Sequence, residues 1–211
     1  MRALGDKMGN NTNTNEKFSS WRDIENEISN CSKCGTLPKL TCTSFKTGNS
    51  KILVVGESPA KDGWIVSGNA FYNKDGKLQS TGRVLNKLLA LCGMTIDDIN
   101  FTEACKCVIE DKKILKQCSE NCKPILFKQL EKFDCNIILP MGKYPTETIL
   151  GIKIDKLSDF VGKKFEINFG KTTKKVIPIY HTSPVNPLCY KGNEKIFNEL
   201  DGINEQEDFE M

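Results

Sequence analysis

The segment Lys51–Ala60, which reads KILVVGESPA, contains the two features that decide the fold of this chain. Its first half is a continuous apolar run, typical of a short strand that is buried on both faces of a sheet. The run leads directly into a polar loop, Gly56-Glu57-Ser58-Pro59-Ala60. Because ligands of open α/β sheets bind beyond the carboxyl ends of the strands, this loop is a candidate site.

The rest of the chain alternates between helical and strand patterns. Apolar residues at helical spacing predict helices over 18–30, 81–92, 121–133, 144–150 and 194–200. Apolar runs predict further strands over 99–106, 136–140, 165–169 and 175–180. This alternation favours a mostly parallel sheet with helices on both faces. We therefore predict a single three-layer α/β/α domain over residues 18–200, between a disordered Asn/Thr-rich segment, 1–17, and an acidic tail, 201–211.

The composition is that of an ordinary globular protein. The 211 residues suffice for one domain, and 27% of them are charged while 38% are hydrophobic. The net charge of +3 permits nucleic-acid binding without requiring it. No apolar run approaches the ~20 residues that span a bilayer, and the N-terminus lacks the pattern of a signal peptide. We expect a monomeric, cytoplasmic protein with reduced thiols and no membrane partner.

Ten cysteines in such a protein indicate metal ligation rather than a disulfide framework. Cys31 and Cys34 form a CxxC pair, a spacing that lets two thiolates reach one metal from a tight turn. The downstream candidates, two of which would complete a four-thiolate site, are Cys105, Cys107, Cys118 and Cys122. The charged segment 110–117 is suited to a loop around such a centre. The spacing leaves an iron–sulfur cluster, zinc and a simple redox pair open.

Two polar residues lie at predicted strand ends, where they could carry chemistry. His181, the only histidine, follows the apolar run 176–180, and Glu57 follows the first strand. A histidine can donate or accept a proton near neutral pH, and a carboxylate can orient or activate water. Position alone also allows a structural histidine and an ordinary loop carboxylate.

Taken together, these residues resemble the iron–sulfur uracil-DNA glycosylases, family 4 of the uracil-DNA glycosylase superfamily. The likeness covers the ordered chain from about residue 30 to residue 200. The motifs that carry it are the CxxC pair, the Gly-Glu-x-Pro-Gly-like loop at 56–60, the Gly-x-x-Phe segment at 68–71, the Gly-Arg pair at 82–83, Lys106-Cys107, Cys122-Lys123-Pro124 and the sequence HTSPVNP at 181–187.

The resemblance implies a DNA glycosylase with a structural 4Fe-4S cluster. It selects four cysteines as cluster ligands and leaves Cys105 and Cys118 as neighbours without a family counterpart. The ligands implied are Cys31, Cys34, Cys107 and Cys122.

The resemblance also implies roles at the reacting base. Phe71 would stack on a base flipped out of the DNA, His181 would stabilise negative charge near the base O2, and Glu57 would orient water and favour a positive sugar. The residues expected to bind the substrate are Gly56, Ser58, Pro59, Phe71, Glu103 and Ser183. Phosphate contacts are expected from the lysines at 171, 174 and 175, which otherwise read as an exposed turn.

Three departures from the family pattern concern the base pocket. Ala60 replaces the last glycine of the first loop, the segment between Ala60 and Gly82 is longer than expected, and Glu103 stands where the family has an asparagine that reads the uracil edge. An ionised carboxylate cannot donate to O4 of uracil. A protonated one donates and accepts, a pattern that suits N3 and N4 of cytosine, and burial would favour that form.

We therefore hypothesise that the excised base is uracil or a cytosine-type pyrimidine with a substituent at C5, for which the longer segment makes room. Glu103 pointing away from the base is the alternative. At the level of the whole protein, the alternatives are a DNA-binding protein of this fold without activity and a zinc-stabilised protein without a nucleic-acid role. Repair of deaminated cytosine and defence against modified phage DNA are both compatible with the sequence.

Overall fold

The computed structural model describes residues 20–35, 37–39 and 45–200. The predicted N-terminal segment 1–17 and acidic tail 201–211 lie outside the described residues. Among the described helices, none combines the length and the hydropathy that crossing a bilayer requires.

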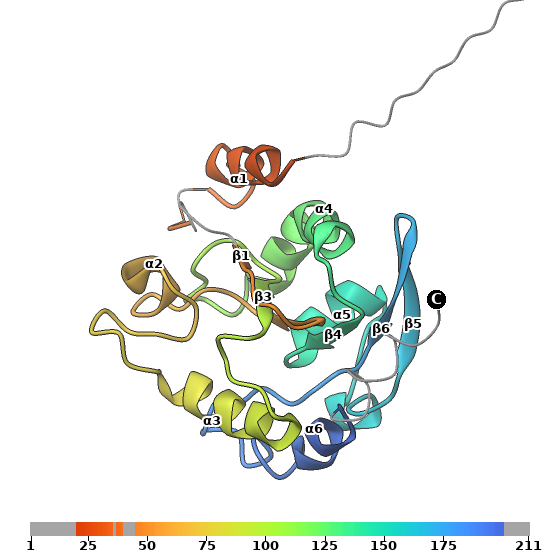
Figure 1. Ribbon diagram of the computed structural model, residues 1–211. Coiled ribbons are helices and arrows are strands. Elements are labelled where there is room, and N and C mark those ends of the chain that lie inside the picture. The colour runs from red at the N-terminus through yellow and green to blue at the C-terminus, as the bar shows by residue number, and fades with distance from the viewer. Residues whose placement is uncertain (1–19, 36, 40–44, 201–211) are drawn as a thin grey trace, which may run out of the picture.

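One sheet of six strands forms the centre of the described chain (Figure 1). The strands are β1 (Phe45–Lys46), β2 (Ile52–Gly56), β3 (Asn100–Glu103), β4 (Ile137–Pro140), β5 (Phe165–Phe169) and β6 (Thr172–Val176). Their order is β1-β3-β2-β4-β6-β5, in which the four central strands are parallel and the two outer strands antiparallel to their neighbours. The register pairs Gly56 with Glu103 and Val55 with Pro140, so three strands end at the same edge.

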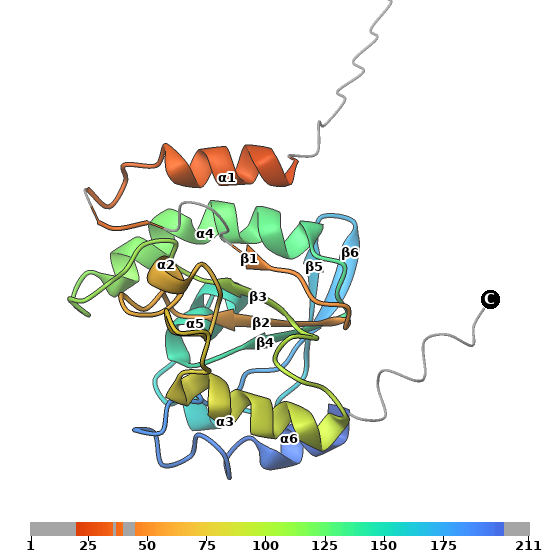
Figure 2. The ribbon, with the colours of Figure 1, turned by 60° about the vertical axis from the view of Figure 1, so that its left-hand side comes forward.

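Helices cover both faces of the sheet and give three layers (Figure 2). One face carries α3 (Ser80–Leu89), η1 (Ala90–Cys92) and α6 (Glu194–Leu200), and the other carries α4 (Leu115–Lys132) and α5 (Lys143–Leu150). Successive residues of β2 point to opposite faces, as the pleat requires. Ile52 and Val54 pack with the first group of helices, and Leu53 and Val55 pack with the second.

The N-terminal helix α1 (Trp21–Ser29) packs on α4 (Figure 2), and its Trp21 stacks on Phe45 of β1 with 3.9 Å between the ring centroids. It begins with a capping box, in which Ser20 and Asp23 satisfy each other's backbone N–H groups. Ile24 and Ile28 form its buried face and contact Ile125 of α4. The chain then leads directly from α1 to the CxxC pair.

The predicted three-layer α/β fold is confirmed, and several element boundaries are corrected. Helix α4 begins at Leu115 instead of residue 121, so the segment 110–117 is only partly a loop. The helix starts early because Leu115, Cys118 and Cys122 bury one continuous face, which outweighs the backbone hydrogen bond lost at Pro124. The last strand, β6, ends at Val176, well before the predicted residue 180. The short helices α2 (Trp64–Ser67) and η2 (Leu157–Asp159) and the strand β1 were not predicted.

Candidate functional site

A small cavity of about 130 Å³ lies at the carboxyl ends of β2 and β3. It is much smaller than the roughly 300–1,000 Å³ typical of small-molecule pockets, so it suits a single ring. Six of the predicted site residues line it, namely Gly56, Glu57, Ser58, Phe71, Glu103 and His181. Pro59 and Ser183 do not line it: Pro59 is buried within the first loop, and Ser183 contacts the cavity residue His181 through its backbone N–H. The parallel sheet thus brings together residues that are up to 125 positions apart in the chain.

His181 is held in one orientation and one tautomer. Its Nδ1 accepts a hydrogen bond of 3.0 Å from the backbone N–H of Ser183. Because a backbone amide can only donate, the neutral ring carries its proton on Nε2. Burial lowers the pKa of His181 below its ordinary value of 6.5, while nearby Glu57 opposes this effect. At neutral pH the ring is therefore an uncharged hydrogen-bond donor through Nε2.

Asn186 and Asn193 fix the loop that carries His181. The Asn186 side chain donates to the His181 carbonyl oxygen at 3.1 Å. The fully buried Asn193 accepts from the Tyr180 N–H at 2.8 Å and donates to the Tyr180 carbonyl at 3.0 Å. The Asn193 side chain thus satisfies both backbone groups of Tyr180, as a neighbouring strand would. The sequence analysis missed Asn193, because an asparagine before a helix is indistinguishable from an ordinary cap.

Glu57 faces a cation from another loop. Its carboxylate forms an ion pair with Lys112, which lies between β3 and α4. A second pair at 3.2 Å joins Lys61 to Glu110 and links the same two loops. These contacts tie the loop of the candidate catalytic carboxylate to the loop that precedes α4.

Three aromatic rings form one wall of the cavity. The Phe71 and Phe101 ring centroids are 4.3 Å apart, and Trp64 lies 5.4 Å from Phe101. Phe71 has φ +70°, and among the described residues it is the only one besides glycine with a positive φ. Such strain persists only where surrounding structure imposes it. Gly82 of α3 allows the close approach, since a Cβ there would lie 2.8 Å from the Phe71 Cβ.

Glu103 is buried in the cavity wall with an unused oxygen. Among the described residues its Oε2 is the one buried side-chain oxygen or nitrogen without a hydrogen-bond partner. Burial raises the pKa of Glu103 to about 8, Lys106 and Lys112 oppose the rise, and Glu57 adds to it. A Cβ on Gly56 would overlap Oε2, so a larger residue there would displace the Glu103 carboxyl group. At neutral pH this position therefore offers a protonated carboxylic acid. The alternative that Glu103 points away from the cavity is wrong.

Lys106 is a buried cation that the sequence analysis did not assign to the site. Its Nζ contacts the Glu103 carbonyl oxygen, Thr102 Oγ1 at 2.8 Å and Gln129 Oε1 at 2.6 Å. Burial lowers the pKa of Lys106 to about 8. Its own backbone N–H donates to Cys122 Sγ at 3.4 Å. Lys106 thereby joins the carboxyl end of β3 to the cysteine region.

The four predicted cluster cysteines converge in this region. An isolated bridge pairs Lys39, five residues after Cys34, with Cys107. The Asn121 side chain donates to Cys34 Sγ at 3.4 Å and so joins the CxxC turn to α4, which carries Cys122. Burial raises the pKa of Cys107 to about 11, and the thiolates of Cys122, Cys34 and Cys31 contribute to the rise.

All nine cysteines of the described ranges are free thiols, and Cys42 lies outside those ranges. Within the same ranges, no group of three or more His, Cys, Asp or Glu side chains is gathered closely enough for a single metal ion. A four-iron cluster is a larger body than one ion, and its thiolate ligands stand further apart. Cys118 lies within hydrogen-bonding reach of Cys34, and Cys105 is near Cys118 and Cys122.

The lysines predicted to contact phosphates do not belong to this site. Lys174 is buried, and its Nζ contacts the Phe133 carbonyl oxygen at 2.5 Å and Cys135 Sγ at 3.5 Å. The turn between β5 and β6 lies at the amino-terminal edge of β6, opposite the cavity. For Lys174 the prediction was wrong, because charge in the sequence does not reveal whether a side chain is buried. For Lys171 and Lys175 phosphate contact stays a prediction.

Comparison with known proteins matches this architecture to one family. A model of the uracil DNA glycosylase superfamily matches residues 43–200. The chain belongs to the uracil-DNA glycosylase superfamily. It is 30% identical over 174 residues to the type-4 uracil-DNA glycosylase of Archaeoglobus fulgidus, an alignment that covers 80% of this chain and 84% of that protein. It is 27% identical over 190 residues to the type-4 uracil-DNA glycosylase of Saccharolobus solfataricus, covering 84% and 83%. The family resemblance found in the motifs is thus confirmed.

Proposed function

We propose that this superfamily member is a DNA glycosylase that flips out a pyrimidine nucleotide, hydrolyses its N-glycosidic bond and leaves an abasic site. The observation that carries the proposal is that Glu57, His181 and Phe71 line one cavity of about 130 Å³. The names of the two relatives, both uracil-DNA glycosylases, support the same reaction.

The cavity is a recess of about 130 Å³ that is too small for a base pair, so the target nucleotide has to leave the DNA stack to enter it. Unstacking and unpairing cost a few kcal/mol. Stacking on an aromatic side chain recovers about 1–3 kcal/mol per base, and Phe71, which lines the cavity, would supply this contact. Because every base has a π-face, this contact holds a base without identifying it.

Cleavage separates charge between the base and the sugar. The bond between the sugar C1′ and the base nitrogen breaks, and its electron pair leaves with the base. His181, uncharged and with its proton on Nε2, donates to the developing negative charge near base O2. The Glu57 carboxylate favours the positive sugar and orients the water whose oxygen bonds to C1′. That water releases one proton, and the departing base takes one up.

Glu103 lines the cavity, and we propose that it reads the Watson–Crick edge of the base. A protonated carboxylic acid donates through its hydroxyl and accepts through its carbonyl. Cytosine offers an acceptor at N3 and a donor at N4, and uracil offers an acceptor at O4 and a donor at N3. Neutral Glu103 satisfies either edge, depending on which oxygen carries the proton. We therefore propose that the pocket takes cytosine-type bases as well as uracil.

The size of the cavity limits the base further. The longer segment after Ala60 forms the wall of the cavity through Trp64, Ala70 and Phe71. A C5 substituent must therefore be small to fit. Uracil excision would serve repair, whereas excision of modified cytosine would act on modified viral DNA.

A panel of oligonucleotides tests the proposal. Each carries uracil, cytosine or a C5-modified cytosine, and abasic sites are quantified for the parent and for Glu103→Gln. We expect cleavage of uracil and of at least one cytosine-type base, with a changed ratio of their kcat/KM values in the variant. Robust activity on uracil alone, unaltered by Glu103→Gln, would refute the reading of Glu103.

We further propose that Cys31, Cys34, Cys107 and Cys122 hold a 4Fe-4S cluster. Four thiols from two loops and one helix, clear of any disulfide, are the donor set that such clusters use. The cluster would supply structural cross-linking when bound. It would tie the CxxC turn and α4 to the loop after Glu103, a loop that Lys106 also holds.

Iron and sulfide content tests the ligand set. Single alanine variants of the four cysteines are compared with Cys189→Ala, a half-buried cysteine outside this region, and with Cys118→Ala. We expect loss of iron and of the visible absorbance in the four ligand variants only. Loss in Cys118→Ala with retention in one of the four would reassign that ligand, and zinc in place of iron would overturn the proposal.

One observation favours the alternative of a DNA-binding protein without activity. The Glu57 carboxylate forms an ion pair with Lys112, which competes with the water that Glu57 would orient. The variant Lys112→Met separates the two readings, with Lys113→Met as the matched control. If the ion pair positions Glu57 for catalysis, cleavage falls up to about fivefold, the scale of a surface ion pair. If the protein only binds DNA, the parent, Glu57→Gln and His181→Ala all bind equally and none produces abasic sites.

A further inference from the structure

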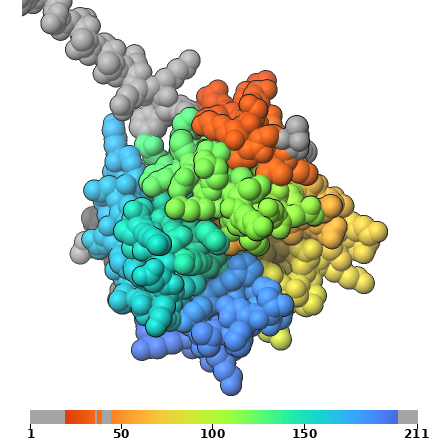
Figure 3. All heavy atoms as spheres, turned by 180° about the vertical axis from the view of Figure 1, so that it is seen from behind, coloured from red at the N-terminus to blue at the C-terminus, as the bar shows by residue number. Residues whose placement is uncertain are grey.

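A second and larger cavity, of about 430 Å³, lies between α4 and α5. Figures 1 and 3 show the two helices side by side on one face of the molecule. None of the residues that line this groove lines the catalytic cavity. The groove therefore needs an explanation of its own, and its lysines are Lys116, Lys123, Lys143 and Lys153.

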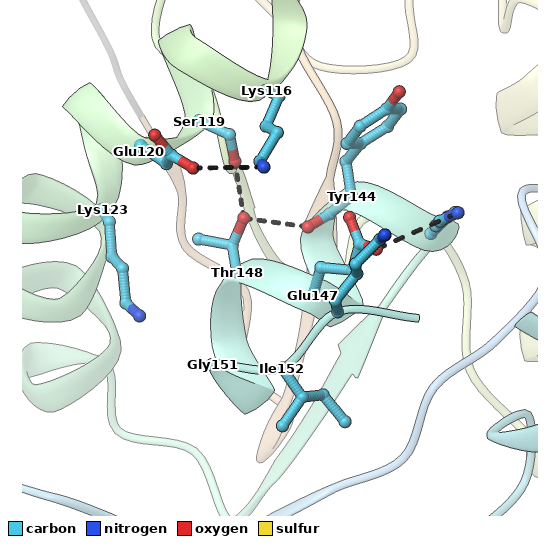
Figure 4. A pocket seen from close by; sticks show the side chains of 11 residues that line it. Lys116, Ser119, Glu120, Lys123, Tyr144, Glu147, Thr148, Gly151 and Ile152 are labelled. Atoms are coloured by element: carbon cyan, nitrogen blue, oxygen red, sulfur yellow. Dashed lines mark hydrogen bonds and ion pairs between the residues drawn. The ribbon is translucent and has the colours of Figure 1, made fainter. Parts of the chain in front are cut away.

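The groove carries an excess of positive charge. Its two carboxylates are partly engaged, because Glu120 lies 3.9 Å from Lys116 and Glu147 lies 4.0 Å from Lys143 (Figure 4). Glu147 also accepts from the Ile154 N–H at 2.8 Å. Among the described residues, neither Lys123 nor Lys153 forms an ion pair. These two ammonium groups remain available for an anionic ligand.

Hydroxyl groups close the floor of the groove. Ser119 of α4 and Thr148 of α5 are in contact at 2.5 Å between their oxygens, and Thr148 donates to the Tyr144 carbonyl at 2.9 Å (Figure 4). Tyr144 also packs beside Cys118 and Leu115, next to the cysteine region. The two helices are thus fastened to each other beneath an open, basic channel.

The groove begins at the edge of the catalytic cavity. Helix α5 starts at Lys143, directly after Gly142, where a Cβ would lie 3.7 Å from the His181 Cβ. Helix α4 starts at Leu115, three residues after the Lys112 that contacts Glu57. Both helices run away from this edge, so the channel extends from Lys116 and Lys143 in their first turns toward Lys123.

We propose that this groove binds single-stranded DNA that flanks the flipped nucleotide, with its lysines contacting the phosphates. The inference rests on the proposed glycosylase function and adds a second contact region for the same strand. Proteins that bind single-stranded DNA without sequence preference use a positively charged groove that follows the phosphate backbone of the DNA. A groove of about 430 Å³ is within the size range of small-ligand pockets and is too small for a duplex.

The test compares oligonucleotides with short and long flanks. The short oligonucleotide is single-stranded DNA with one uracil and about two nucleotides on each side of it. The two long ones have about ten further nucleotides on the 5′ or on the 3′ side, a length within the roughly 4–16 nucleotides that single-strand binding sites cover. Fluorescence anisotropy gives Kd as a function of salt for the parent and for the double variant Lys123→Glu/Lys153→Glu. The matched control is Lys87→Glu, an exposed lysine on α3 beyond the opposite face of the sheet.

We expect the double variant to lose roughly tenfold in affinity for one long-flank oligonucleotide and about 1.4 in the slope of log Kd against log salt. Short-flank binding and Lys87→Glu should be unchanged. Equal losses on short and long flanks, or tighter binding of inorganic phosphate than of the long flank, would overturn the proposal. Because Lys123 follows Cys122, iron content must match the parent. Binding is measured without cleavage, so failure of the glycosylase assay on the short oligonucleotide separately refutes the proposed function.

Discussion

Glu103 is the residue that most changes the chemistry of this pocket, because a carboxyl group stands where the family pattern has the amide of an asparagine. Its raised pKa of about 8 makes it a neutral donor and acceptor at pH 7. An ionised carboxylate would only accept, and would repel O4 of uracil or N3 of cytosine. The groups that face Glu103 are Lys106, Lys112 and Glu57, of which the two lysines lower its pKa and the glutamate raises it.

At this residue we predict an alkaline limit to activity. In the parent, kcat/KM should fall as the pH rises through about 8, because Glu103 loses the proton with which it donates. In Glu103→Gln the amide cannot titrate, so this limb should disappear. The measurement is a pH profile of single-turnover cleavage for both proteins. An identical alkaline limb in the variant would assign it to another group.

The same carboxyl predicts a stability effect of definite sign. Between the ordinary pKa of 4.5 and about 8, the folded state keeps a proton that the unfolded state has lost, so stability falls as the pH rises. Replacing Glu103 with Gln removes this loss, which is on the order of 1.4 kcal/mol per pH unit in that window. Denaturant unfolding of both proteins at several pH values checks it. A difference that does not grow toward pH 8 would contradict a buried, neutral Glu103.

At the scale of elements, α3 and the loop before it set the position of the stacking ring. Gly82 lets the helix approach Phe71, whose backbone is held at φ +70°. We predict that Gly82→Ala displaces Phe71 and destabilises the fold by about 1–3 kcal/mol, as overpacking does. Cleavage should fall more than DNA binding, because the base is then misplaced. The control is Ser80→Ala, at the exposed start of the same helix.

A second prediction at this scale concerns α1 and the cysteines. Ile28 is buried against Ile125 of α4, and the chain continues from it directly to Cys31. Ile28→Ala should cost about 2–5 kcal/mol and accelerate loss of iron to a chelator, because the CxxC turn is then less firmly held. Val66→Ala, at a largely exposed side chain, should change neither. Unchanged iron release despite the loss of stability would separate α1 from the cluster.

At the scale of the whole molecule, the sheet decides the site. Glu57 and Glu103 follow parallel neighbours, and His181 follows the chain that leaves β6, so one edge collects all three. A strand buried on both faces is visible in sequence as an apolar run, and a helix as a repeat of 3.6 residues. These local signals were sufficient for the layers and for the loops that carry Glu57 and His181, whereas Phe71 was found only through the motif shared with the family.

Features that depend on contacts with other helices and strands could not be predicted from the sequence. The early start of α4 depends on a face that only the folded cysteine region buries. Burial of Lys106, Lys174 and Asn193 depends on contacts with residues 13 to 41 positions away. Charge and polarity in sequence describe what a side chain can do and leave open whether water reaches it.

The sequence by itself determined the fold class, the family and six of the residues that line the cavity, because periodicity and motif spacing are properties of the chain alone. Only the tertiary structure decided that Glu103 is buried and unpartnered, that Lys112 meets Glu57, and that four lysines face one groove between α4 and α5. All three features arise only when distant segments of the chain pack against each other, because packing removes water from some side chains and brings others close together.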